Sequence, residues 1–354
     1  MQTLQQRIDS LAKLGQELQW YVNEFVQHNN NFYAEDSPFS KAVQLAGAAN
    51  GWFTKQSVIQ AFQAIIPWLS QESLYNWINN YSLPEINNQP KTIGVVMAGN
   101  IPLVNFHDLL SVLISGHRFL GKLSSSDPYL MPFIVQVLIQ IDPAWQSYIA
   151  FTDGRLQHPD AIIATGSNNT SRYFDYYFSR YPHIIRRNRT SVAVLHGHET
   201  DVQLQALGTD VFSYYGLGCR NVSKLFLPHG YSVARLIEQF KVYENVIEHH
   251  KYHNNYDYQK AILLINKQPF FDGGFILLKE DKALHAPVST LHYEFYTSLQ
   301  QVQASVLQHA EHIQCVVSSL PMQPVQTIQP GQTQQPSLTD YPDGVDVIKF
   351  LTEL

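Results

Sequence analysis

Cysteine, long apolar runs and excess positive charge are all scarce in this chain, and each absence argues against a class of protein. Only two of the 354 residues are cysteines, so a disulfide scaffold is excluded and a reducing compartment is favoured. The formal net charge is −6 and no long basic run occurs, which argues against nucleic acid as a partner. No segment approaches the roughly 20 apolar residues that a bilayer-spanning helix needs, so we expect no membrane span.

The N-terminal stretch also lacks the features of a signal peptide. Residues 1–19 have the spacing of an amphipathic helix, and Arg7, Asp9 and Lys13 interrupt any continuous apolar run. Together with the low cysteine count, this pattern predicts a cytoplasmic protein.

What the chain does contain is material for a large core. Hydrophobic residues make up 45% of it, including 20 Tyr and 19 Phe, and its length favours two domains over one. Helical spacing continues to about residue 83, where Pro84–Pro90 breaks it. We predict a domain over 1–190 that holds these helices and a nucleotide-binding sheet, a second α/β domain over 191–320, and an extended tail over 321–354.

From Lys91 onward, short apolar strands alternate with helical stretches, which is typical of βαβ units with a mainly parallel sheet. Helices are predicted over 105–115, 129–141 and 170–181. The predicted strands are Thr92–Ala98, Phe119–Leu123, Tyr148–Phe151, Ala161–Ala164, Val192–Leu195, Lys224–Leu227, Phe275–Lys279 and Ile313–Val317.

Such sheets bind ligands beyond the carboxyl ends of their strands, and three predicted strands end in suitable turns. These turns are Gly99-Asn100, Lys122–Ser126 and Thr165-Gly166-Ser167. The first offers a side-chain amide, the second a lysine for a ribose or phosphate, and the third a Gly-Ser turn at a helix start. Simpler interpretations stay open, because the same residues also suit a helix cap, a solvated lysine and an N-cap turn.

Cys219 lies in the stretch YYGLGCRNVSKLFLP, just before a predicted strand. The nearby glycines allow a substrate to approach the backbone closely. Arg220 and Lys224 could favour the thiolate, which is the reactive form of the side chain. The alternative is a buried, inert cysteine, and Cys315 in its apolar strand fits that description.

In order along the chain, these motifs resemble those of the aldehyde dehydrogenase superfamily, from about Lys91 to Ser319. The nearest likeness is its acyl-CoA reductase branch, which includes the fatty-acid reductase component of bacterial luminescence systems. The resemblance implies an α/β fold of the aldehyde dehydrogenase type: a helical N-terminal region, a Rossmann-type cofactor domain and an α/β catalytic domain.

The resemblance also implies roles for individual residues. GNIPL is similar to the family's Asn-aromatic-Pro motif, so Asn100 would stabilise an oxyanion, and GKLSS is similar to the Lys-Pro-Ser-Glu motif, so Lys122 would contact the adenosine ribose. Thr165-Gly166-Ser167 is similar to the Thr-Gly-Ser loop beside the nicotinamide. GLGC is similar to the Gly-Gln-x-Cys motif, which makes Cys219 the nucleophile.

Three departures from the family pattern refine this reading. The stretch 184–188 carries no carboxylate where hydrolysing members have the glutamate that activates water, which favours transfer of the acyl group over its hydrolysis. Ser125 stands where an acidic residue often accepts the ribose hydroxyls, which permits NADP(H), although Asp127 lies close by. Ala283 stands where a glutamate grips the nicotinamide ribose, so cofactor binding would be looser or rebuilt.

The resemblance therefore predicts an acyl-CoA reductase that forms an aldehyde with NADPH or NADH from an acyl-CoA or acyl carrier protein thioester. Two alternatives stay open: a CoA-acylating aldehyde dehydrogenase running in the oxidative direction, and a non-catalytic subunit that keeps the fold. A homo-oligomer also stays open. We predict no metal site, since the histidines at 249, 250 and 253 lack further ligands at suitable spacing.

Overall fold

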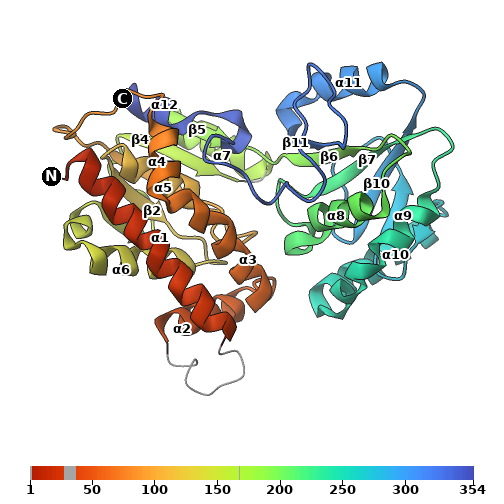
Figure 1. Cartoon of the computed structure of the whole chain (residues 1–354), viewed down its shortest axis with the longest axis horizontal. Helices are drawn as coiled ribbons and strands as arrows, with labels where there is room; N and C mark the ends of the chain where they lie inside the picture. Colours follow the sequence, from red (N-terminus) through yellow and green to blue (C-terminus); the bar gives the residue numbers. More distant parts are fainter. Residues whose placement is uncertain (1, 28–36, 167) are drawn as a thin grey trace. The chain divides into compact units, whose positions relative to one another are not determined.

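A computed structural model describes residues 2–27, 37–166 and 168–354 of the chain. It divides into two compact units (Figure 1). The first holds Met1–Arg187 and Ser337–Leu354, and the second holds Asn188–Pro336. The predicted boundaries differ in two places: the chain passes between units after Arg187 rather than after residue 190, and residues 321–354 are shared by both units instead of forming a separate tail.

The first unit begins with helices whose starts are fixed by hydroxyl caps. Ser37, Thr54 and Ser70 each accept a hydrogen bond from a backbone N–H in the first turn of the helix that follows. Arg7 is buried at 2% exposure, and its guanidinium donates to three backbone carbonyls, so its charge is solvated by the protein itself. The helices are α1 (Leu4–Gln27), α2 (Pro38–Ala49), α3 (Lys55–Ile65) and α4 (Gln71–Ile78).

A five-stranded parallel sheet follows, with strand order β3-β2-β1-β4-β5. Because the chain first builds outward from β1 through β2 to β3 and then returns to the other side with β4, the order reverses between β1 and β4. The strands are β1 (Thr92–Val96), β2 (Arg118–Lys122), β3 (Ile149–Thr152), β4 (Ala161–Thr165) and β5 (His183–Arg186). The helices between them are α5 (Phe106–Ile114), α6 (Leu130–Ile141) and α7 (Asn168–Phe178).

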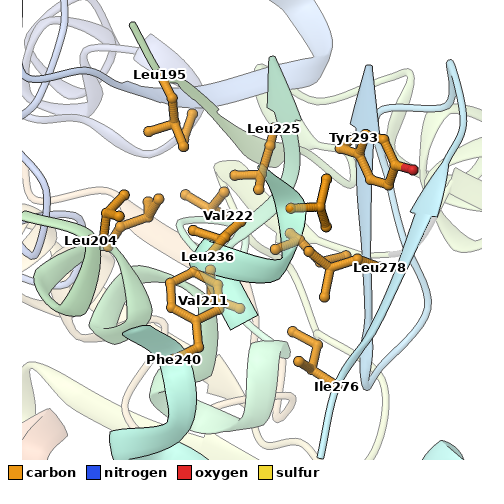
Figure 2. Packing of buried hydrophobic residues seen from close by; sticks show 14 of the residues in the cluster. Leu195, Leu204, Val211, Val222, Leu225, Leu236, Phe240, Ile276, Leu278 and Tyr293 are labelled. Carbon is orange, nitrogen blue, oxygen red and sulfur yellow. The ribbon is translucent and has the colours of Figure 1, made fainter. Parts of the chain in front are cut away.

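The second unit contains a six-stranded sheet of order β11-β6-β7-β10-β9-β8, parallel except for β8. Buried side chains of α8, α9 and the sheet form its larger core, of which Leu204, Leu236 and Leu225 are labelled in Figure 2. The strands are β6 (Thr190–Val194), β7 (Val222–Pro228), β8 (Phe271–Asp272), β9 (Leu277–Glu280), β10 (Thr290–Tyr296) and β11 (Ile313–Val317). The helices are α8 (Asp201–Phe212), α9 (Val233–Phe240), α10 (His250–Ile265) and α11 (Leu299–Gln308).

The last eighteen residues return to the first unit, where α12 (Val347–Thr352) packs on α5 (Figure 1). Two buried histidines bind this segment, with His107 Nε2 lying 3.0 Å from Leu338 O and His117 Nε2 lying 3.1 Å from Leu351 O. In the described part of the chain, no helix is both long enough and apolar enough to cross a bilayer.

Candidate active site

The predicted cofactor residues gather at one edge of the first sheet. Lys122 ends β2 and Thr165 ends β4, while Asn100 lies in the loop after β1. Val96, the last residue of β1, is in register with Lys122 on one side and with Ala164 on the other. The three motifs therefore meet at the carboxyl edge, on both sides of the point where the strand order reverses. Ser167 lies outside the described residues.

The loop that carries Asn100 packs tightly on its neighbours. A Cβ atom added at Gly99 would lie only 2.6 Å from Ser124 Oγ and 2.9 Å from Ser126 Cβ. Asn50 Nδ2 donates to Gly99 O at 3.1 Å. Only glycine allows this approach between the loops after β1 and β2, and the Asn100 side chain that follows is exposed.

A chain of buried polar groups anchors the same loop from below. Ala98 N donates to Asn105 Oδ1 at 2.8 Å, and Asn105 Nδ2 donates to Asp108 Oδ2 at 2.9 Å. The Asp108 carboxylate in turn accepts two hydrogen bonds from Arg186, at 2.7 and 2.8 Å. Burial alone would raise the pKa of Asp108, but the charge and hydrogen bonds of Arg186, together with the Asn105 amide, bring it below its usual value.

The loop after β2 contains two candidates for recognition of the adenosine ribose, the exposed Ser125 and the buried Asp127. Ser125 is exposed, and Lys122 is partly buried at the end of its strand. Asp127 is 5% exposed and accepts backbone hydrogen bonds, among them one at 3.3 Å from the N–H of Leu130, the first residue of α6. Burial raises the pKa of Asp127 to about 6. Its carboxylate thus accepts hydrogen bonds from the backbone of its own loop and from Leu103 in the loop after β1.

The turn after β4 offers an unsatisfied hydroxyl. Thr165 Oγ1 is buried and, among the described residues, has no hydrogen-bond partner. A Cβ at Gly166 would lie 2.9 Å from Phe174 Cε2 and 3.1 Å from Thr170, so only glycine fits there. A buried hydroxyl without a partner is costly, and a ligand hydroxyl or amide at this edge would satisfy it.

Cys219 lies in the second unit, at the amino end of β7 rather than at a carboxyl edge. It occupies a tight turn closed in both directions, since Asn221 N donates to Gly218 O at 3.0 Å and Gly218 N donates to Asn221 Oδ1 at 2.8 Å. Ser191 Oγ also donates to Cys219 O at 3.0 Å. Cys219 is partly exposed, whereas Cys315 in β11 is 4% exposed.

The backbone before this turn is strained. Tyr214, Tyr215 and Gly216 have φ values of 50°, 58° and 79°, so three consecutive residues are left-handed. Non-glycine residues adopt this conformation at a cost of roughly 1–2 kcal/mol each. Residues held in such conformations concentrate at functional sites, where packing over-determines them.

The two cations near Cys219 behave differently. Lys224 is fully buried, and its Nζ lies 3.1 Å from Glu294 Oε2 and also donates to Asp281 O. Burial lowers the pKa of Lys224 despite this pairing. The Lys224 ammonium is therefore already paired with Glu294 and the Asp281 carbonyl. Arg220, which directly follows Cys219, is the partly exposed cation.

A family model described as "Acyl-CoA reductase (LuxC)" matches residues 2–233. The chain belongs to this family. Two curated relatives, both named long-chain acyl-protein thioester reductase, are 21% identical over 280 residues (Photorhabdus laumondii) and 23% identical over 219 residues (Aliivibrio fischeri). These alignments cover 74% and 56% of this chain but 55% and 44% of the relatives, so the chain spans about half the length of the curated relatives it matches.

Solved structures confirm the predicted aldehyde dehydrogenase fold. Aldehyde dehydrogenase 21 from Physcomitrella patens, in complex with succinate, superposes with a TM-score of 0.59 at 11% identity, covering 89% of this chain and 77% of that one. A mutant indole-3-acetaldehyde dehydrogenase from P. syringae, in complex with NAD+ and IAA, gives 0.59 at 12% identity, covering 90% and 77%.

In this member of the acyl-CoA reductase family, each unit contains supporting residues that the sequence patterns did not single out. Asn105 and Asp108 support the Asn100 loop, and Asp210 and Asn221 support the Cys219 turn. Each is a buried polar residue with at most 2% exposure. A buried carboxylate in the apolar helix FHDLLSVLI was the available signal for Asp108, since such a group needs a partner.

Residues 184–188, which occupy the place of the family's water-activating glutamate, begin within β5 and contain no carboxylate. Arg186 in this stretch forms a salt bridge with Asp108. In the described residues, no group of three histidine, cysteine or acidic side chains is arranged to hold a metal ion.

Proposed function

We propose that this chain reduces an acyl thioester to an aldehyde through a covalent thioester on Cys219. The observation that carries this proposal is the doubly closed turn that presents a partly exposed cysteine beside Arg220. The family match and the curated relatives, named as thioester reductases, support the same chemistry.

The chain's own residues account for the acyl-transfer step. The Cys219 thiolate attacks the thioester carbonyl, forming an S–C bond, and the carrier leaves as a thiolate with the electron pair of the broken C–S bond. The Cys219 backbone N–H and, by family resemblance, the Asn100 amide are assigned to the oxyanion. Because residues 184–188 hold no base to activate water, the acyl group is kept for reduction rather than hydrolysis.

The residues at the carboxyl edge of the first sheet fit a nicotinamide cofactor. Among the described residues the buried Thr165 hydroxyl has no partner, Gly166 admits no side chain, and Lys122 supplies a cation at the end of β2, on the other side of β1. We assign the nicotinamide ribose to Thr165–Ser167 and the adenosine ribose to Lys122 and Ser125. When bound, the reduced cofactor supplies the hydride that the overall reduction requires.

We further propose that this edge accepts NADPH. Ser125 brings no negative charge that would repel a 2′-phosphate, and the Asp127 carboxylate is buried among backbone N–H groups rather than exposed beside it. NADH remains compatible with the same residues, because no group here requires a phosphate.

The test separates acyl transfer from reduction. Without cofactor, a series of medium- and long-chain acyl-CoA and acyl carrier protein thioesters should each be screened for a covalent adduct by intact-protein mass. We expect an adduct that Cys219→Ser abolishes and that the matched variant Cys315→Ser retains. Addition of NADPH or NADH should then release aldehyde and consume cofactor.

Three results would count against the proposal. Adduct formation by Cys219→Ser would exclude the assigned nucleophile. An adduct that never yields aldehyde with either cofactor would favour a non-catalytic or acyl-carrying role, consistent with Ala283 replacing the ribose-binding glutamate. Faster NAD+ reduction from aldehyde and CoA than aldehyde formation would favour the oxidative direction.

A further inference from the structure

Residues 330–334, which we call the strap, pass along the nucleophile turn within the second unit. The strap was expected to be part of an extended connection, yet Thr333 is fully buried and Gln334 is 9% exposed. Gly331 has a φ of 85°, and a Cβ there would lie 3.1 Å from Ala206 Cβ, so the strap lies close against α8. A segment without regular structure that is buried this way needs its polar groups satisfied.

One buried carboxylate accepts hydrogen bonds from several polar groups of the strap. Asp210, near the end of α8, is 0% exposed and accepts hydrogen bonds from Gly331 N at 2.7 Å, Thr333 N at 3.0 Å and Thr333 Oγ1 at 2.8 Å. Burial raises the pKa of Asp210, and these three donors oppose that rise. A carboxylate enclosed by three donors fixes the strap in a single position.

The strap then binds the residue that follows the nucleophile. Arg220 Nε donates to Thr333 O at 2.6 Å. On the other side of the turn, Asn221 Nδ2 donates to Asp210 O at 3.0 Å and to Ser213 O at 2.8 Å. Asp210 thus connects to the turn twice, through its carboxylate by way of the strap and through its own carbonyl by way of Asn221.

The geometry points to a role for this arrangement in reactivity: we propose that the strap is a positioning element that holds the Arg220 guanidinium beside Cys219 and so keeps the thiol deprotonated. Cys219 and Arg220 occupy the two central positions of the turn closed by Gly218 and Asn221. The hydrogen bond from Nε fixes the plane of the guanidinium. The remaining N–H groups of the guanidinium are also donors, and the group keeps its positive charge.

A nearby fixed cation is an established way to favour a thiolate. Other titratable groups around the turn are Asp210 and Tyr214, and His249, whose ring packs on Tyr215 with centroids 4.4 Å apart. Arg220 is the cation among them whose position the strap controls. Asp210 and Thr333 are therefore positioning residues that act through Arg220, and their reactive role depends on the nucleophile assigned above.

The experiment measures the Cys219 thiol directly, without substrate or cofactor. In the full chain carrying Cys315→Ser, the rate of alkylation by iodoacetamide is followed from pH 5 to pH 10, which gives the thiol pKa. We expect Arg220→Gln to raise that pKa, so that the alkylation rate rises with pH at a higher pH than in the parent and is lower at neutral pH. Arg220→Lys should recover part of the rate, because it restores the charge without the Nε bond.

The strap variants separate positioning from simple stability. Thr333→Val removes one donor to Asp210, and we expect a smaller rise in thiol pKa in the same direction, while Thr333→Ser should behave as the parent. Arg235→Gln is the matched control, since Arg235 pairs with Asp201 on the surface and should leave the profile unchanged. Unfolding midpoints of all variants show whether any has lost its fold.

An unchanged thiol pKa in a folded Arg220→Gln variant overturns the inference, as does a Thr333→Val variant whose stability falls with no change in the alkylation profile. Failure here is distinguishable from failure of the proposed function. A shifted thiol pKa without acyl adducts would leave the positioning role standing and remove the reductase assignment, whereas adducts with an unshifted pKa would do the reverse.

Discussion

The two units present their candidate residues at opposite ends of their strands. In the first unit, Asn100, Lys122 and Thr165 lie at or just beyond the carboxyl ends of parallel strands. In the second, Cys219 lies in a turn before β7, at the amino end of its strand. The rule that ligands bind beyond carboxyl edges therefore finds the first set and gives no information about the second.

The two loops also differ in what holds them. The Asn100 loop rests on a buried ion pair, because its support passes through Asn105 to Asp108 and Arg186. The Cys219 turn is supported by a neutral amide, Asn221, and by the Asp210 carboxylate, which accepts hydrogen bonds from two backbone N–H groups and one hydroxyl. Removing half of an ion pair leaves a bare charge in the interior, whereas removing an amide leaves only dipoles. The supports should thus differ in how much their loss costs.

The largest effect is expected from breaking the ion pair. Arg186→Met leaves the fully buried Asp108 without its partner, and we expect the free energy of unfolding to fall by about 3–5 kcal/mol. Urea denaturation measures this loss. Arg187→Met is the matched control, because its pair with Asp175 is solvent-exposed and should be worth at most about 1 kcal/mol. Similar losses in both variants would mean that the Arg186 pair is not the support described.

Loss of the amide in the second unit should cost less. Asn221→Ala removes the acceptor of Gly218 N–H and the donor to the carbonyls of Asp210 and Ser213. We expect the free energy of unfolding to fall by about 1–3 kcal/mol, the usual cost of buried polar groups left without partners. The same denaturation experiment reports it. A loss larger than that of Arg186→Met would reverse the comparison between the two supports.

Much of the first unit could be predicted because its pattern is local. The order of helices and parallel strands from Thr92 to Thr165 follows from short apolar runs separated by helical spacing, and β11 begins and ends at the predicted residues. Three strands were not predicted: β5, β10 and the two-residue β8 (Phe271–Asp272). β5, HIIR, has only two apolar residues between polar ends, and β10, TLHYEFY, has polar residues at alternate positions, so neither shows up in a search for continuous apolar runs.

The supports of both loops could not be predicted for a different reason. Asp108 and Arg186 are separated by 78 residues, and Asp210 and Thr333 by 123. Residue spacing along the chain cannot predict contacts between groups this far apart. The tertiary arrangement brings them together, and local sequence patterns do not reveal it. The motif residues can be recognised from their neighbours in the sequence. The residues that support them can be recognised only from tertiary contacts.

The smallest effect concerns pH and the C-terminal segment bound to the first unit. His117 Nδ1 must accept the hydrogen bond from Lys91 N, so Nε2–H donates to Leu351 O, and this arrangement requires a neutral ring. Burial lowers the pKa of His117, with the Leu351 bond opposing that shift. The unfolded chain therefore binds the extra proton first, and stability present above about pH 6.5 is lost as the pH falls toward the folded pKa.

We expect this single histidine to steepen the fall in the free energy of unfolding by at most about 1.4 kcal/mol per pH unit below pH 6.5. Urea midpoints between pH 8 and pH 5 should fall less steeply in His117→Asn than in the parent. The raised pKa of Asp127 works in the opposite direction, but it is common to both proteins and cancels in the difference. His183→Asn, at an exposed position of β5, is the control, and a variant of His117 that keeps the parent slope would show that the ring is not held neutral by its two bonds.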